Sequence, residues 1–192
     1  MIDPDSGFDL HPHDNMEIIT MVMRGAVTHG DSMGNDKVVL AGDVQVMSAG
    51  TGVVHSEYNR SIDTPLELFQ IWIYPRERGV APHYDQRSYG TTWSANTLQL
   101  IVSPDGRDDS LSICQDAFIL RGMLESGHSL FYDLHDPAHG LYVFVVDGSL
   151  TVDGQRLDSH DAIGVTDIRS IVLNTDIEQG SHCILFEVPM DH

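Results

Sequence analysis

Two short motifs near the start of the chain carry the residues that could do chemistry. His11-Pro12-His13 is the first, and His55-Ser56-Glu57 is the second. In an extended strand residues i and i+2 point to the same face, so each motif can aim both of its donors into one cavity. Three imidazoles and a carboxylate suit iron, nickel, copper or zinc better than calcium or magnesium. If the two strands are neighbours, the spacing predicts a divalent transition-metal site.

The elements that must position these donors are strands. Runs rich in Val, Ile, Tyr and Phe alternate with turns rich in Gly, Asp and Asn, whereas helical periodicity is scarce. Many short strands at this spacing predict an all-β sandwich or barrel. The predicted strands cover 18–23, 38–40, 44–47, 52–55, 66–74, 98–102, 117–120, 130–132, 141–146, 162–165, 171–173 and 183–188.

A weak internal repeat predicts two such β units. Arg24-Gly25-Ala26-Val27 corresponds to Asp147-Gly148-Ser149-Leu150, and a second Asp-containing turn at 41–44 corresponds to 160–163. The second unit is therefore expected to keep the scaffold and to lack the ligand set. Its residues at the four donor positions, in this alignment, are Leu134, Asp136, Leu173 and Thr175.

The stretch from Pro75 to Thr97 has little periodicity and contains several Pro and Gly residues. It is interpreted as the connection between the units. The predicted division is therefore a metal-binding domain at 1–80, a connection at 81–97 and a degenerate domain at 98–192.

The composition excludes some classes of function. Asp and Glu number 29 against 10 Lys and Arg, giving a formal net charge of −19 at pH 7. Such a chain is not expected to bind nucleic acid directly, which needs a basic surface, or an anionic membrane. Cys114 and Cys183 lack ligand-like spacing and are expected to be reduced thiols. Because no signal peptide or apolar span is visible, a cytoplasmic location is expected.

The chain resembles the pirin family of the cupin superfamily, and in particular the bacterial quercetinase-like pirins. The resemblance is dense from Gly7 to about Tyr89 and thinner beyond it. The motifs that carry it are His11-Pro12-His13 with Glu17, the run 29–35, Gly42-Asp43-Val44-Gln45, the run 47–52, His55-Ser56-Glu57-Tyr58 and Gln70-Ile71-Trp72-Ile73.

The resemblance implies two tandem cupin-type β-barrels, with the metal in the N-terminal barrel. It implies His11, His13, His55 and Glu57 as ligands of one divalent ion. Fe²⁺ is the first choice, with nickel, copper, manganese, cobalt and zinc as alternatives. Pirins usually carry further strands before the first motif, so the N-terminal barrel is expected to lack its first strands. Such an open edge favours a homo-oligomer or another protein partner.

The implied activity is oxidative cleavage of a flavonol-like substrate by O₂, in the manner of a quercetin 2,3-dioxygenase. The substrate would be a small aromatic or enol-type molecule, whose hydroxyl the ion would make more acidic. Glu57, or Glu17 as a pocket acid, would accept the proton. The alternative function is a non-enzymatic, metal- or redox-responsive co-regulator that binds other proteins.

The remaining histidines have no partner at ligand spacing and are expected on the surface or in turns. They are His29, His83, His128, His135, His139, His160, His182 and His192. His135 and His139 lie near the donor positions of the second unit, but no partial site is expected there.

Overall fold

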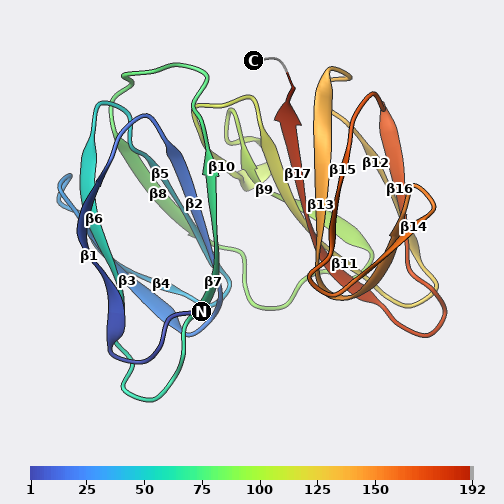
Figure 1. Ribbon diagram of the computed structural model, residues 1–192, viewed down its shortest axis with the longest axis horizontal. Coiled ribbons are helices and arrows are strands. Elements are labelled where there is room, and N and C mark those ends of the chain that lie inside the picture. Colours follow the sequence, from blue (N-terminus) through green and yellow to red (C-terminus); the bar gives the residue numbers. More distant parts are fainter. Residues whose placement is uncertain (191–192) are drawn as a thin grey trace. The chain divides into compact units, whose positions relative to one another are not determined.

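The computed structural model describes residues 1–190, which are almost entirely strands and turns (Figure 1). Within them the one helical element is a short 3₁₀ turn, Arg107–Asp109. The chain divides into two compact units. The first comprises residues 1–92, 104–107 and 111–115, and the second comprises 93–103, 108–110 and the chain from Asp116 onward. His192, which was predicted to be exposed, lies outside the described residues.

The first unit contains two antiparallel four-stranded sheets. One has the order β1-β6-β3-β4, with β1 Ser6–His13, β6 Val53–Asn59, β3 Ala26–Asp31 and β4 Asp36–Leu40. The other has the order β7-β2-β5-β8, with β7 Glu67–Ile73, β2 Glu17–Arg24, β5 Asp43–Ser48 and β8 His83–Ser88. The short strand β10, Leu111–Ser112, also belongs to this unit.

The register of the first sheet brings the two motifs together. β1 and β6 are antiparallel neighbours, and His11 lies directly opposite His55. On the other edge of β6, His29 of β3 lies opposite Glu57. Residues that face each other across a ladder share a face, and so do residues i and i+2. All the donors of this sheet therefore point to the same side, which confirms the expectation that the two motifs lie on neighbouring strands.

The opposing sheet contributes polar residues from its inner face. Thr20 of β2 lies opposite Gln45 of β5 and Gln70 of β7. Glu17 has the opposite parity on β2, and it lies opposite Ser48. The strand geometry thus directs Glu17 to the other face of this sheet.

β8 lies in the segment that was expected to be only a connection. Its sequence, His-Tyr-Asp-Gln-Arg-Ser, is polar, and an edge strand of this composition gives almost no hydrophobic pattern to detect. It pairs with β5 from Asp43 to Ser48. The predicted first domain, 1–80, falls wholly within the first unit.

The second unit is also built from antiparallel strands around one apolar core. The strand order is β11-β17-β13-β16-β12, and β14 and β15 also pair with β13. The bounds are β9 Thr97–Ser103, β11 Phe118–Leu124, β12 Ser129–Asp133, β13 His139–Val152, β14 Gln155–Asp158, β15 Ala162–Val165, β16 Ser170–Asn174 and β17 Ser181–Pro189. The core includes Val143, Leu150, Leu173 and Leu185, all fully or almost fully buried.

The ladder corrects one detail of the repeat. Leu173 corresponds to His55, and the residue opposite Leu173 is Leu130 rather than Leu134. β12 ends at Asp133, so Leu134 and Asp136 lie in the connection to β13. The connection between β12 and β13, residues 134–138, is longer than the connection between β1 and β2, residues 14–16. An alignment made on Gly25 and Gly148 alone is therefore out of register before this connection. With either alignment the counterparts of His11 and His55 are leucines.

Gly50 sets the turn from which β6 departs with His55. Its φ is +49°, and a Cβ there would lie 2.1 Å from the carbonyl oxygen of Val80. We expect Gly50→Ala to lower the free energy of unfolding by more than about 2 kcal/mol, since it adds a backbone clash to an unfavourable φ. Gly34→Ala is the control, because Gly34 also has positive φ (+93°) but nothing within 4 Å of the added carbon. Equal losses of stability in urea titrations would contradict the role of the contact with Val80.

Candidate metal centre

Three imidazoles from two strands meet on the inner face of the first sheet. The ring centroids are 4.9 Å apart for His11 and His13, 4.4 Å for His11 and His55, and 5.0 Å for His13 and His55. One nitrogen of each ring lies within 4.8 Å of the others. This is a spacing at which one cation can be shared. The structure therefore brings together the three histidines that the sequence singled out.

The hydrogen bonds of these rings leave nitrogen lone pairs available to bind a metal ion. His11 Nδ1 lies 2.7 Å from the carbonyl oxygen of Asp9, which can only accept, so His11 presents Nε2 as a lone pair. His55 is 1% exposed, and both its ring nitrogens are buried without a hydrogen-bond partner. A buried polar atom left unpaired costs free energy, and coordination of a cation would satisfy one of the two nitrogens. The residues present therefore fit a metal ion.

Burial and the neighbouring imidazoles keep His13 and His55 uncharged. Burial, followed by the charges of His11, His29 and His13, lowers the pKa of His55 to about 3. Burial and the neighbouring His11 also lower the pKa of His13. Neutral imidazole is the form that binds a metal, so these rings are in the ligating state at neutral pH without having to lose a proton.

Glu57 lies beside this cluster and is held from the opposite sheet. It is 2% exposed, and its Oε1 accepts from Gln45 Nε2 at 3.1 Å and its Oε2 from Gln70 Nε2 at 2.7 Å. The Gln45 amide nitrogen also donates to the Thr20 hydroxyl at 3.3 Å. The Gln70 amide oxygen accepts from the indole nitrogen of Trp72 at 3.1 Å. The two amides therefore hold both oxygens of the Glu57 side chain in place beside the histidines.

His29 is a site residue that the sequence did not reveal, and its expected exposure is wrong. It is fully buried, and together with His55 and Glu57 it forms a second group whose ligand atoms lie within 4.8 Å of one another. Its Nε2 donates to Asp31 Oδ2 at 2.9 Å, which leaves Nδ1 as a buried acceptor without a partner. The carboxylate-histidine pair resembles those that orient ligands in metal sites.

The Asp31 side chain is itself firmly held. Burial raises its pKa, but hydrogen bonds from His29 and Asn35 outweigh this and lower the pKa overall. Asn35 donates through its backbone amide at 3.0 Å and its side chain at 2.8 Å. The tight turn between β3 and β4 therefore fixes the orientation of the His29 ring.

Glu17 belongs to a different environment. It is fully buried, Ser48 donates to its Oε2 at 2.5 Å, and it is in neither of the two groups of ligand atoms. Burial raises its pKa, while Ser48 and the amide of Cys114 act in the opposite direction. Its expected role as a pocket acid stays a prediction.

The second unit has its own buried histidine. His139, which was expected to be exposed, is 4% exposed, and its Nδ1 lies 2.8 Å from Glu187. His135 Nδ1 contacts the same carboxylate at 2.9 Å. The two groups of three ligand atoms found in the described part of the chain both lie in the first unit, and the degenerate second domain stays a prediction.

Comparison with known proteins agrees with this architecture. The family model described as Pirin matches residues 1–73, and the model described as Quercetinase C-terminal cupin domain matches residues 100–188. A quercetin 2,3-dioxygenase of Escherichia coli (strain K12) is 39% identical over 189 residues, which are 98% of this chain and 79% of that protein. This chain belongs to the pirin family. The expected resemblance and the all-β, two-barrel cupin architecture are both confirmed.

Solved pirin structures have the same fold. The crystal structure of YhhW from Escherichia coli has a TM-score of 0.91 and 39% identity, and the match covers 100% of this pirin and 79% of that chain. The nickel(II) complex of the bacterial pirin YhhW matches with a TM-score of 0.86 over 95% of this chain and 76% of the other. Along residues 1–190, no helix of this pirin is long and apolar enough to cross a membrane.

Proposed function

We propose that this pirin is a metal-dependent dioxygenase that cleaves a flavonol-like substrate with O₂. The observation that carries the proposal is the convergence of His11 and His13 on His55, whose two nitrogens are buried and unpartnered. The proposal is supported by a relative named quercetin 2,3-dioxygenase at 39% identity. A cytoplasmic location is part of the proposal.

The proposed ligands are His11, His13, His55 and Glu57. The three histidines share one group of ligand atoms, and Glu57 adjoins it through His55 in the second group. Fe²⁺ is the proposed physiological ion, and the nickel(II) complex of YhhW supports a site that also accepts nickel. Three neutral imidazoles and one carboxylate around a divalent ion leave a charge near +1, which favours an anionic oxygen of a substrate.

The ion, when bound, supplies a Lewis acid that lowers the pKa of a substrate hydroxyl. The residues of the chain do the rest. The Glu57 carboxylate, held in place by Gln45 and Gln70, accepts the hydroxyl proton. Trp72 lies edge-on to His13, with ring centroids 5.1 Å apart, and is 54% exposed, so it offers an aromatic edge where a flat substrate would enter.

Quercetin turnover tests the proposal. Protein purified without added metal is analysed for its elements, loaded with Fe²⁺ without oxygen and mixed with quercetin. We expect the flavonol absorbance to persist until O₂ is admitted and then to fall, and His128→Ala, an exposed histidine of the second unit, to leave this unchanged. If the absorbance shows no oxygen-dependent loss and the protein binds another protein in a metal-dependent way, the dioxygenase proposal is wrong and the co-regulator is favoured.

His29 provides a second prediction at this site. We expect His29→Phe to weaken metal affinity about 10- to 100-fold, the usual cost of losing a residue that orients the ligands. A second variant for comparison is Asp31→Asn. It keeps the turn between β3 and β4 but weakens the hydrogen bond that orients the His29 ring. Metal titrations of both variants, with His83→Phe on the exposed face of β8 as control, provide the measurement. An affinity unchanged in His29→Phe would remove His29 from the site.

A further inference from the structure

We propose that the second unit has a ligand site of its own, which binds a molecule with an apolar body, a hydroxyl donor and no negative charge. The site is a pocket of about 530 Å³ between β9, β11 and β12. It is separate from the candidate metal centre, and the inference is independent of the proposed dioxygenase activity.

The walls of the pocket are apolar. Leu98 and Leu100 of β9, Leu120 of β11 and Leu130 of β12 line it, and all four pack into the core of the second unit. The volume lies within the range of pockets that hold small organic ligands. Burial of an aromatic or aliphatic body against these side chains would supply most of the binding free energy.

His135 and Tyr132 form a polar end in this apolar pocket. The Tyr132 hydroxyl donates to Glu187 Oε2 at 2.5 Å, and His135 Nδ1 lies 2.9 Å from the same oxygen. Because a carboxylate accepts, His135 carries a proton on Nδ1, and the neutral ring then presents Nε2 as an acceptor. The ring also stacks on Phe118, with centroids 3.6 Å apart and planes 3° from parallel. The orientation of the acceptor is therefore fixed before a ligand arrives.

Glu187 is a strong anchor for this arrangement. It is fully buried, and besides Tyr132 and His135 it accepts from His139 Nδ1 at 2.8 Å and from the backbone amides of His135 and Asp136. Burial raises its pKa, but these hydrogen bonds outweigh it, and the pKa is lowered overall. The group is thus an ionised carboxylate that keeps the His135 tautomer fixed.

A purely structural role would account for Glu187 and His139, which are buried, but not for His135. The His135 side chain is 30% exposed and lines the pocket, whereas that of His139 is 4% exposed. Among the described residues no hydrogen bond is formed by His135 Nε2. An oriented acceptor at the edge of an apolar pocket is suited to a hydroxyl donor of a ligand.

The charged residues of the pocket define what is excluded. Asp108 and Asp133 are exposed residues in its lining. Two carboxylates repel an anionic ligand and attract an ammonium group. A molecule that combines an aromatic ring, a hydroxyl and a positive charge therefore matches the pocket best.

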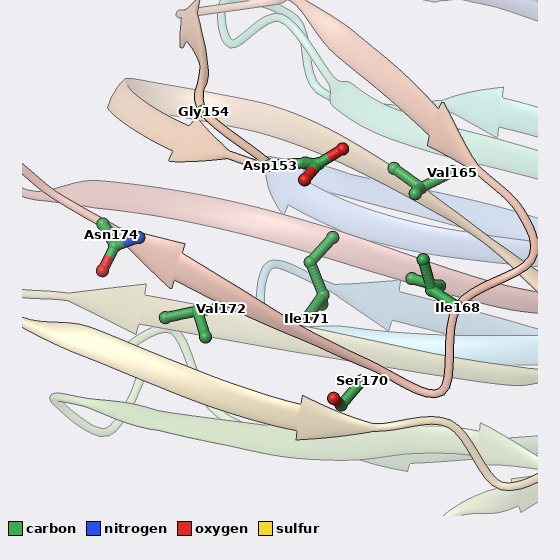
Figure 2. Close-up of a pocket in the computed structure, with 8 residues that line it drawn as sticks. All are labelled: Asp153, Gly154, Val165, Ile168, Ser170, Ile171, Val172 and Asn174. Atoms are coloured by element: carbon green, nitrogen blue, oxygen red, sulfur yellow. The ribbon is translucent and has the colours of Figure 1, made fainter.

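A second cavity of this unit lacks such a set of polar groups. It has a volume of about 290 Å³, and Figure 2 shows Val165, Ile168 and Ile171 around it, with Asp153 at its edge. Among the described residues that line it, Asp153 is the one ionisable group. No oriented donor or acceptor pair comparable to His135 and Glu187 is found in that lining.

Tyramine is the probe, since it has a phenol hydroxyl and an ammonium group. Its affinity is compared by calorimetry with that of phenethylamine, which lacks the hydroxyl, and 4-hydroxyphenylacetate, which is anionic. All measurements use the full chain, also as the His55→Ala variant, so that the metal centre does not contribute. We expect tyramine to bind at least tenfold more tightly than either analogue, with the same result in His55→Ala.

Two variants test the location. His135→Phe keeps the stacking on Phe118 but removes the acceptor, and we expect it to weaken tyramine at least tenfold and to leave phenethylamine unchanged. Thr97→Trp blocks the pocket from an exposed position of β9 without touching Glu187, and it should weaken all three probes. His128→Phe is the matched control. Absence of binding at millimolar tyramine, or binding unaffected by both variants, would overturn the proposal.

Discussion

His55→Ala will abolish tight metal binding by this pirin, with an expected loss of affinity of at least about a thousandfold. Removing a residue that only orients a ligand typically costs 10- to 100-fold, and the loss of a ligand itself costs more. His55 is also the residue that both groups of ligand atoms share, so among residues 1–190 neither set of three remains without it. Oxygen-dependent loss of quercetin absorbance should disappear with the metal.

Thermal unfolding with and without Fe²⁺ or Ni²⁺ distinguishes the loss of a metal ligand in His55→Ala from a folding defect. A metal that binds only the folded protein raises the unfolding temperature, and tighter binding raises it further. In His55→Ala that increase should vanish. The metal-free variant should unfold near the wild-type temperature, since the substitution removes two buried nitrogens without partners. A variant that still gains stability from the metal would show that His55 is not a ligand.

Acid will destabilise the metal-free protein well above the pH at which its carboxylates titrate. The pKa of His55 is about 3 in the folded protein and about 6.5 in the unfolded chain. Between these values the unfolded chain binds a proton that the folded protein does not bind, so the free energy of unfolding falls as the pH falls. Above about pH 6.5 this residue contributes no pH dependence. The slope is up to about 1.4 kcal/mol per pH unit.

Urea unfolding at pH 7, 6, 5 and 4 in the presence of a chelator measures this slope. The lowered pKa of His13 acts in the same direction. In His55→Asn the contribution of His55 disappears, so the profile should be flatter than in the wild type. Equal profiles for the two proteins would contradict the lowered pKa of His55.

The strands predicted from the sequence correspond to most of those in the structure, but β1, β3, β8, β10 and β14 were not among them. The predicted strands and the three histidines both follow from short periods. His11, His13 and His55 are related by i, i+2 spacing within extended segments, and the register that joins β1 and β6 places them on one face. The same spacing singled out Glu57, and the family resemblance implied it as a ligand. The expected boundaries of the domains rested on composition alone, and an edge strand such as β8 is too polar to give a signal.

His29, Gln45 and Gln70 could not be found in this way. Each is a single polar residue in a strand, and its role depends on which strand lies opposite, which is a property of the sheet order rather than of local spacing. His29 had one usable sign, the run from His29 to Asn35, in which Asp31 closes a turn and contacts the ring. The sequence also shows that Glu17 and Thr20 point to opposite faces of a strand. Only the strand pairing in the structure shows which of these faces lies toward the histidines.

The position of Glu57 has a mechanical consequence. The carboxylate belongs to β6 of one sheet, while Gln45 and Gln70, which hold it, belong to the opposite sheet. A cation bound to Glu57 would therefore clamp both layers of the barrel together, although β5 and β7 supply no proposed ligand. Amide hydrogen exchange in those two strands should slow when the ion is added. This protection would show that the metal centre stabilises the domain, in addition to any role in catalysis.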